Sequence, residues 1–450
     1  MTLNRRDLLI GASPLIAGAT LAATPTKANA KAHIDSILDL ADSGLKPNAK
    51  RDQTKALQAA IDKASKQGKR LLLPGGTFIS GPLTLRSNLH LEGVAGATKL
   101  KFSGGAGFLV GIDVQNFSIR NLEIDGALKA FGHEDLNALI ALDRVKNFSV
   151  QDCLIKNSAI NGFSLRQSSG QIVSCQISNC DVTGIFALDS TGLEVLQNHV
   201  SDCANNGILI WRSQKGYDGS LVANNRIERI AAKAGGTGQN GNGVNVFRAG
   251  SVVVSNNVID DCTFSAVRNN GGDNVQIVNN SCTNLGEVAL YSEFKFEGAV
   301  ICNNVVDDAH VGISITNFNE GGRLATATGN LIRNIKNRKD VPGIGIAVEA
   351  DTMVTGNVIE DVEGAGIGIG WEKYMRNVTA NNNLIRGAEI GIGVSTHNEA
   401  GFALIATNMI TDTKQGAIRA MDKDKPLGPD LSKSSSEAFR NLAVYGNVSL

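Results

Sequence analysis

Proline and aromatic residues are scarce in this 450-residue chain, and neither sign of charge is in excess. With 8 prolines, 2 tryptophans and 4 tyrosines, the composition disfavours a wide core of large rings and favours a narrow one with frequent turns. Lysine plus arginine (43) equals aspartate plus glutamate (43), so no basic surface for nucleic acid is predicted. After residue 30, no apolar run is long enough to cross a bilayer.

What the chain does have is 50 glycines and a repeated asparagine. The repeat aligns on nine asparagines, with Cys153 and Cys175 in the same place before them: Asn198, Asn225, Asn257, Asn280, Asn304, Asn330, Asn357, Asn383 and Asn408. By subtraction, neighbouring positions in this series are 22 to 32 residues apart. A period of this length predicts a solenoid, in which each unit packs on its neighbours.

The interior of each unit indicates strands rather than helices. The residue two after the asparagine is apolar in most units, and a segment such as Gly207 to Ile210 (GILI) follows in the same unit. Apolar and outward positions alternate with a period of two, and no unit holds a helix-length amphipathic run. Leucine-rich, ankyrin and tetratricopeptide repeats are therefore disfavoured. We number the strands of a unit so that the G-I-x-I segment is the first, and the asparagine separates the second from the third.

This pattern resembles the right-handed parallel β-helix of the pectate-lyase-like superfamily. The resemblance implies an all-β fold of about 12 coils, with three short strands in each coil. It also implies that the asparagine lies in the tight turn between the second and third strands, in the left-handed conformation, and hydrogen-bonds along a ladder of like residues. In enzymes of that superfamily, the outer face of the first sheet carries the active cleft.

Residues 1–30 resemble a twin-arginine export signal. Arg5 and Arg6 precede an apolar stretch that runs to about Ala23, and small residues up to Ala30 suit a cleavage site. This predicts cleavage after about Ala30, a periplasmic or secreted protein, and no stable membrane insertion afterwards.

The remaining chain divides into three predicted parts: an N-terminal cap with first coils (31–116), regular coils (117–421), and a polar loop with a last partial coil (422–450). The cap should contain a helix over residues 52–67, with Asp52 as its N-cap and Gly68 as its stop. Two units are enlarged before their first strands, at residues 231–242 and 337–342. Loops at these positions are candidates for contact with a ligand at the first sheet.

Five of the seven cysteines fall into two columns of the repeat: Cys153 with Cys175, and Cys180 with Cys203 and Cys262. Their spacing is not a zinc pattern, and an odd number leaves at least one unpaired. We therefore favour buried free thiols over disulfides.

Aromatic and charged residues gather on the outer face of the predicted first sheet. The candidates for substrate binding are Trp211, Arg212, Arg268, Tyr291, Trp371 and Lys373. Such a strip suits a sugar polymer, because sugar rings stack on aromatic rings while charged groups bond hydroxyls or carboxylates.

Two kinds of reaction fit this strip. Glu349 and Glu372 lie on adjacent coils and could form the pair of carboxylates that hydrolysis requires. His397, with Tyr291, Arg268 or Lys373, supplies the base and cation for a uronate lyase or C5-epimerase. The motifs N-T-D, G-H-G and R-I-K of polygalacturonases and D-P-H-D of alginate epimerases are absent.

Over nearly its whole length the chain resembles the twin-arginine-translocated repetitive β-helix proteins, whose activity is not assigned. The sequence thus predicts an exported protein that acts on or binds an acidic polysaccharide, as a lyase, epimerase or hydrolase. The alternative is a non-catalytic β-helix that binds a glycan or another envelope component. No cofactor and no metal site are predicted, although acidic turns leave Ca²⁺ open as a surface ligand.

Overall fold

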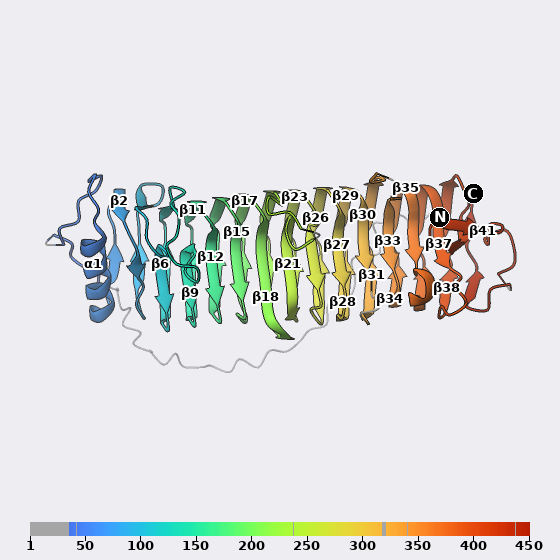
Figure 1. Ribbon diagram of the computed structural model, residues 1–450, viewed down its shortest axis with the longest axis horizontal. Coiled ribbons are helices and arrows are strands. Elements are labelled where there is room, and N and C mark those ends of the chain that lie inside the picture. The colour runs from blue at the N-terminus through green and yellow to red at the C-terminus, as the bar shows by residue number, and fades with distance from the viewer. Residues whose placement is uncertain (1–35, 42, 237, 317–320, 340, 437) are drawn as a thin grey trace, which may run out of the picture. The chain divides into compact units, whose positions relative to one another are not determined.

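The computed structural model describes residues 36–41, 43–236, 238–316, 321–339, 341–436 and 438–450. Residues 37–450 form one compact unit, a solenoid whose coils follow one another from the N-terminal helix to the C-terminal strands (Figure 1). The predicted export signal lies outside the described residues. No described helix combines the length and the apolar character that a membrane span requires.

Each coil contributes one strand to each of three sheets, and every pairing between successive coils is parallel. The second sheet has fifteen strands, in the order β1 (Arg70–Leu72), β4 (His90–Glu92), β7 (Gln115–Arg120), β10 (Lys146–Gln151), β13 (Ser169–Val173), β16 (Glu194–Leu196), β19 (Leu221–Ala223), β22 (Val253–Ser255), β25 (Val275–Val278), β28 (Glu297–Cys302), β31 (Arg323–Thr328), β34 (Ala350–Thr355), β36 (Arg376–Asn381), β38 (Ala403–Ala406) and β42 (Leu442–Tyr445).

The first and third sheets are joined because β35 (Val358–Ile369) and β37 (Leu384–Ser395) run through both. The other strands of the first sheet are β3 (Leu83–Thr84), β6 (Leu109–Ile112), β9 (Ala138–Asp143), β12 (Asn161–Arg166), β15 (Thr183–Leu188), β18 (Asn206–Tyr217), β21 (Asn242–Gly250), β24 (Val267–Asn270), β27 (Val288–Glu293), β30 (Val311–Ile315), β33 (Ile344–Val348) and β40 (Ile418–Asp422), with β41 (Lys425–Leu427) antiparallel to β40. Those of the third sheet are β2 (Gly76–Ser80), β5 (Thr98–Phe102), β8 (Glu123–Asp125), β11 (Leu154–Ser158), β14 (Gln176–Cys180), β17 (His199–Cys203), β20 (Arg226–Ile230), β23 (Val258–Cys262), β26 (Ser281–Leu285), β29 (Val305–Ala309), β32 (Leu331–Ile335), β39 (Met409–Thr413) and β43 (Val448–Ser449).

The coil number exceeds the predicted value of about 12. Fifteen strands in the second sheet make fourteen turns between the first and the last (15 − 1 = 14). The second sheet begins with β1 and β4, in the segment predicted as cap with first coils, and ends with β42, in the predicted last partial coil. The prediction of three short strands in each coil is confirmed.

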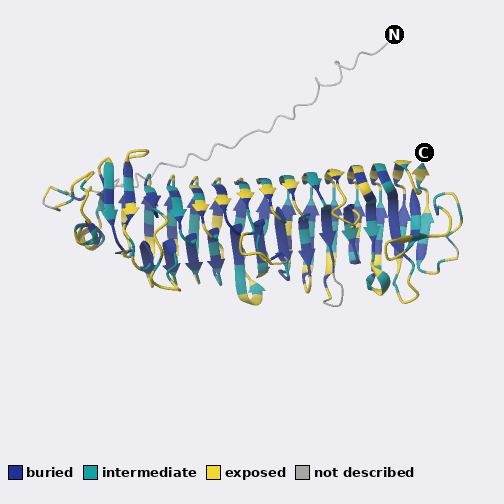
Figure 2. Ribbon diagram, turned by 45° about the horizontal axis from the view of Figure 1, so that its top comes forward, coloured by how far each residue is buried: buried dark blue, intermediate teal, exposed yellow. Residues whose placement is uncertain are grey.

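The core is a narrow column of branched side chains between the three sheets. Buried residues line the inside of every coil, while exposed ones concentrate in the turns and inserted loops (Figure 2). A glycine begins many of the first strands, because the next coil leaves no space there for a side chain. A Cβ atom on Gly366, for example, would lie 2.6 Å from Ile385 Cγ2 and 2.7 Å from the Gly391 carbonyl oxygen.

The predicted asparagine ladder is present. The side-chain oxygen of each ladder residue accepts the backbone N–H of the ladder residue one coil earlier, as Asn257 does from Asn225 at 2.9 Å. The backbone N–H of Cys175 donates to Asn198 Oδ1 at 2.9 Å, so the cysteine occupies the same column. The left-handed conformation was predicted at the asparagine, but the structure places it one residue earlier, at Asn224 (φ 59°) and Gly356 (φ 65°) for instance. The chain reverses there, which leaves the ladder residue free to point inward.

The helix α1 (Thr54–Gln67) lies at the N-terminal end of the coils (Figure 1). Gly68, in the left-handed conformation, ends it as predicted, and its N–H reaches the Ala64 and Ser65 carbonyls. The N-cap is Gln53 rather than the predicted Asp52, whose carboxylate instead accepts the N–H of Thr54 at 2.9 Å. All seven cysteines are free thiols, and only Cys302 is partly exposed.

Candidate functional site

The outer face of the first sheet carries two rows of side chains, one residue from each coil. Row one runs through Asn245, Arg268, Tyr291, Ser314, Ala347, Gly368 and Gly393. Row two runs through Trp211, Phe247, Asn270 and Glu293, and continues through the residues after Ile315, Val348 and Ile369, which are Thr316, Glu349 and Gly370. Because consecutive coils are about 4.8 Å apart, row two covers about 29 Å over six steps.

The first part of these rows surrounds a central hollow of about 330 Å³. Its walls are aromatic: the Trp211 ring lies 5.6 Å from Phe247 and 5.7 Å, edge to face, from Phe186. The indole Nε1 donates to Asn245 Oδ1 at 3.2 Å, which fixes the orientation of the ring. Phe294 and the inserted loop residues Gly238 and Gln239 also line this hollow.

Arg268 is the charged group of the central hollow. It is 8% exposed and lies over the Tyr291 ring at 5.0 Å. Its Nε and Nη2 donate to Glu293 Oε1, both at 2.6 Å, and Glu293 is 2% exposed. Its Nη1 is buried without a hydrogen-bond acceptor among the described residues, and the nearest carboxylate oxygen, Glu287 Oε2, is 3.8 Å away. The guanidinium therefore retains one unused donor, which lies against Gly238 of the inserted loop, where a Cβ would overlap Nη1.

Burial changes the titration of two neighbours of Arg268. It raises the pKa of the Glu287 carboxyl, an effect that Arg268 and Arg338 oppose. It also raises the pKa of the Tyr291 phenol to about 12, with a further contribution from Glu293. Tyr291 is therefore a poor base near neutral pH, and its role here is to support the guanidinium.

The second part of the rows forms a trough, made of two hollows of about 460 and 380 Å³ that share Ile344, Gly368, Gly370 and Trp371. Its floor carries no side chain larger than a methyl group at the outward positions of three consecutive coils, which are Ala347, Gly368 and Gly393. Trp371, 37% exposed, stands beside this floor. Pro342 from the second inserted loop and Pro426 from the β40–β41 hairpin form its outer rim.

Of the three predicted catalytic residues, only Glu349 lines the trough. Glu349 is 4% exposed and lines the trough beside Trp371. Glu372 begins a short 3₁₀ helix, η2 (Glu372–Tyr374), and its carboxylate pairs with Lys423 at 2.8 Å, which lowers its pKa. His397 is exposed in a turn, where its Nδ1 accepts the N–H of Glu399 at 3.2 Å. Neither Glu372 nor His397 is among the described residues that line the trough, so their catalytic roles stay predictions.

Four of the six predicted binding residues lie at the central hollow or the trough. Trp211, Arg268 and Tyr291 belong to the central hollow or support it, and Trp371 belongs to the trough. Arg212 reaches back to the Ser190 carbonyl oxygen at 3.5 Å. Lys373 lies over the Tyr374 ring at 5.9 Å.

Sequence reasoning missed Asn245, Glu287 and Phe294, and it missed the floor of the trough. A signal for the floor was present, since Gly368 and Gly393 occupy outward positions of first strands where larger residues stand in other coils. No comparable signal identified Glu287, because it lies in the turn before β27 and approaches Arg268 only through the folding of the coil.

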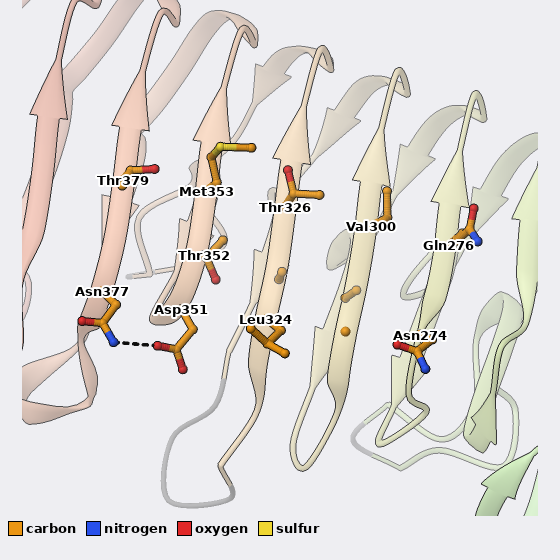
Figure 3. Close-up of a pocket in the computed structure, with 13 residues that line it drawn as sticks. Asn274, Gln276, Val300, Leu324, Thr326, Asp351, Thr352, Met353, Asn377 and Thr379 are labelled. Atoms are coloured by element: carbon orange, nitrogen blue, oxygen red, sulfur yellow. Dashed lines mark hydrogen bonds between the residues drawn. The ribbon is translucent and has the colours of Figure 1, made fainter.

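A larger hollow, about 660 Å³, lies instead on the second sheet, over strands β25 to β36 (Figure 3). Its lining is apolar or carries neutral amides and hydroxyls, apart from Asp351. That carboxylate is already bonded to Asn377 at 2.8 Å, as Figure 3 shows, and to Arg376 at 3.1 Å. We place the candidate site on the first sheet, because the buried charged residues Arg268 and Glu349 line hollows there, whereas Asp351 at the larger hollow is partly exposed.

No metal centre can be assigned. Within the described part of the chain, no three side chains of histidine, cysteine, aspartate or glutamate converge on one point.

These observations define a right-handed parallel β-helix protein with a grooved first sheet. Residues 86–227 match the family model described as the right handed beta helix region. None of the curated proteins matches the sequence of this chain.

Among solved structures, the N-terminal fragment of bacteriophage phi29 gene product 12 is similar with a TM-score of 0.58 and 14% identity, covering 84% of this chain and 67% of its own. The A-module of the Azotobacter vinelandii mannuronan C-5 epimerase AlgE4 is similar with a TM-score of 0.51 and 15% identity, covering 78% of this chain and 96% of its own. At these identities the similarity shows the shared fold.

Proposed function

We propose that this protein is an exported glycan-binding β-helix that holds an extended acidic polysaccharide along the outer face of its first sheet. The observation that carries the proposal is the trough, in which three consecutive coils present Ala347, Gly368 and Gly393 beside Trp371. A sheet face that carries only a methyl group and hydrogens lets a flat ring approach the backbone closely, and an indole supplies an apolar surface on which the ring can stack.

The acidic character of the polymer is proposed from Arg268. A guanidinium that lines the central hollow beside Trp211 and Phe247 suits a sugar that carries a carboxylate. A mannuronan epimerase shares the fold, which agrees with a ligand of this class.

The test measures binding of residues 31–450 to a panel of acidic and neutral polysaccharides by affinity electrophoresis. Gly368→Leu should abolish binding without loss of folding, because a Cβ at that position would lie 3.5 Å from its nearest neighbour and the longer side chain would fill the trough. Gly132→Leu is the matched control, since a Cβ there would lie 3.6 Å from its nearest neighbour, in an exposed loop outside the trough. The proposal fails if no polymer binds, or if both variants bind like the parent.

A catalytic role is the second candidate, and the buried position of Glu349 in the trough favours it. The reaction would be lyase, epimerase or hydrolase chemistry on the bound polymer, with Glu349 as the acid or base. The same incubations are assayed for new reducing ends, for unsaturated products and for inverted uronate residues. A product whose formation stops in Glu349→Gln, with binding retained, would establish an enzyme. Binding without any product would leave the non-catalytic function.

A further inference from the structure

A stripe of exposed apolar side chains follows the third sheet through the C-terminal half of the solenoid. It consists of the residue directly after the ladder asparagine in six consecutive coils: Val305, Leu331, Val358, Leu384, Met409 and Val448. These residues are 39–53% exposed, and Val258, two coils before Val305, extends the stripe. In the N-terminal half the same position holds polar residues such as Gln176, His199 and Arg226. The repeat therefore does not require apolar residues at this position.

The rows on both sides of the stripe are symmetric about one point, which lies between the coil of Leu331 and the coil of Val358. On one side the order is Asn303, Gly329, Gly356 and Asn382, so the two glycines lie nearest to this point. On the other side the order is Asp307, Arg333, Glu360 and Arg386. Reversing the first row leaves it unchanged, and reversing the second row exchanges the signs of its charges.

We propose that this surface is the contact between two copies of the chain, packed stripe against stripe in opposite directions about a two-fold axis at the symmetric point. In that arrangement each row faces the same row of the second copy in reversed order. Arg333 then faces Glu360 of the second copy, and Asp307 faces Arg386 of the second copy. A cation therefore meets an anion at each step, and the glycines at the centre allow the backbones to approach.

The dimensions of the surface indicate a weak dimer. Eight coils from Val258 to Val448 cover about 34 Å, and three rows cover about 13 Å, which gives about 450 Å² for each copy and about 900 Å² in total. This is below the total of about 1,200 Å² at which specific stable interfaces begin. We therefore expect monomers at about 1 µM and a substantial fraction of dimers at about 100 µM.

The first test is sedimentation velocity of residues 31–450 over this concentration range. The double variant Leu331→Lys with Val358→Lys should remain monomeric throughout, because it places four cations at the two-fold axis. Met353→Lys is the matched control and should still dimerise, since it changes a side chain of similar exposure (45%) on the second sheet. Circular dichroism melting checks that each variant is folded.

The second test fixes the direction of the two copies. In the double variant Val305→Cys with Leu384→Cys, the new thiols are three coils apart within one chain, about 14 Å, and are adjacent only between antiparallel copies. Oxidation should therefore join two chains in this variant and should leave the single variant Val305→Cys unlinked. Efficient linkage of the single variant would indicate parallel copies and would overturn the arrangement.

If the stripe does not bind a second copy of the chain, the experiments should give different results. A chain that is monomeric at every concentration, or a dimer that persists in Leu331→Lys with Val358→Lys, overturns the proposal. Flotation of the protein with phosphatidylcholine vesicles, lost in the lysine variant, would assign the stripe to a membrane surface instead.

Discussion

Replacement of one ladder asparagine, Asn304→Ala, should destabilise the solenoid more than any surface substitution. Asn304 Nδ2 donates to the Ile277 carbonyl oxygen at 2.9 Å and to Asn330 Oδ1 at 3.0 Å. Its Oδ1 accepts the backbone N–H and the Nδ2 of Asn280, at 2.9 and 3.0 Å. The substitution therefore removes four hydrogen bonds from a side chain that is 1% exposed.

The expected loss of stability comes from the backbone groups that the substitution leaves without hydrogen-bond partners. The Asn280 N–H and the Ile277 carbonyl lose partners in the interior of the turn, and an unsatisfied buried group costs about 1–3 kcal/mol. We expect a loss of about 3–5 kcal/mol in the free energy of unfolding, measured by urea denaturation of residues 31–450 with circular dichroism. Because a solenoid can open locally, hydrogen exchange of the coils around Asn304 should accelerate as well.

Gln171→Ala is the control for this prediction. It also removes an amide side chain, but one that is partly exposed and makes a single hydrogen bond, to Ser149 Oγ at 3.2 Å. Its expected cost is below about 1 kcal/mol. A loss for Asn304→Ala no larger than that of Gln171→Ala would refute the view that the ladder stabilises the turns.

Three further predictions concern the interior and its titration. Gly366→Ala should lower the free energy of unfolding by about 2–3 kcal/mol, because its Cβ would meet the next coil. Gly368→Ala, two residues further on and open to the trough, should change the free energy of unfolding by less than about 0.5 kcal/mol. Equal losses in the two variants would contradict the packing argument. Burial raises the pKa of the Asp218 carboxyl, so the ionised carboxylate destabilises the folded state as the pH rises through the folded-state pKa. Asp218→Asn should therefore stabilise the protein at pH 7, and this gain in the free energy of unfolding should vanish below about pH 4, near the ordinary pKa of aspartate. Urea titrations at both pH values measure the difference. Burial also raises the pKa of the Cys262 and Cys282 thiols. Ellman's reagent should therefore modify at most Cys302 in the native protein and all seven cysteines after denaturation; rapid modification of more than one native thiol would contradict the burial.

The trough and the apolar stripe lie on different sheets and do not compete. The trough is on the outer face of the first sheet, and the stripe follows the third sheet from the asparagine turn. A dimer through the stripe therefore leaves the central hollow and the trough of each copy accessible. Two copies would then present two glycan-binding surfaces to one polymer. Binding to long polymers would then be stronger than binding to short ones.

The sequence determined the architecture because the β-helix repeats the same local requirements in every coil. A buried asparagine must bond to the next one, branched residues must face a narrow core, and glycine must stand where coils are in contact. Each requirement leaves a residue type at a fixed place in the repeat, as Asn257, Ile259 and Gly243 illustrate. The three strands of each coil and the asparagine ladder were predictable for this reason.

The tertiary structure decided which outward residues meet. Arg268, Glu287 and Glu293 belong to neighbouring coils, and their contacts depend on strand register, on the turn before β27 and on the inserted loop that covers the guanidinium. Outward positions do not pack in the core, so no residue type recurs at them that would identify the functional residues from the sequence. The trough exists because three outward positions without large side chains fall in register, and the stripe exists because six apolar ones do. Register between distant segments is a property of the folded coils, and this register produces the trough and the apolar stripe.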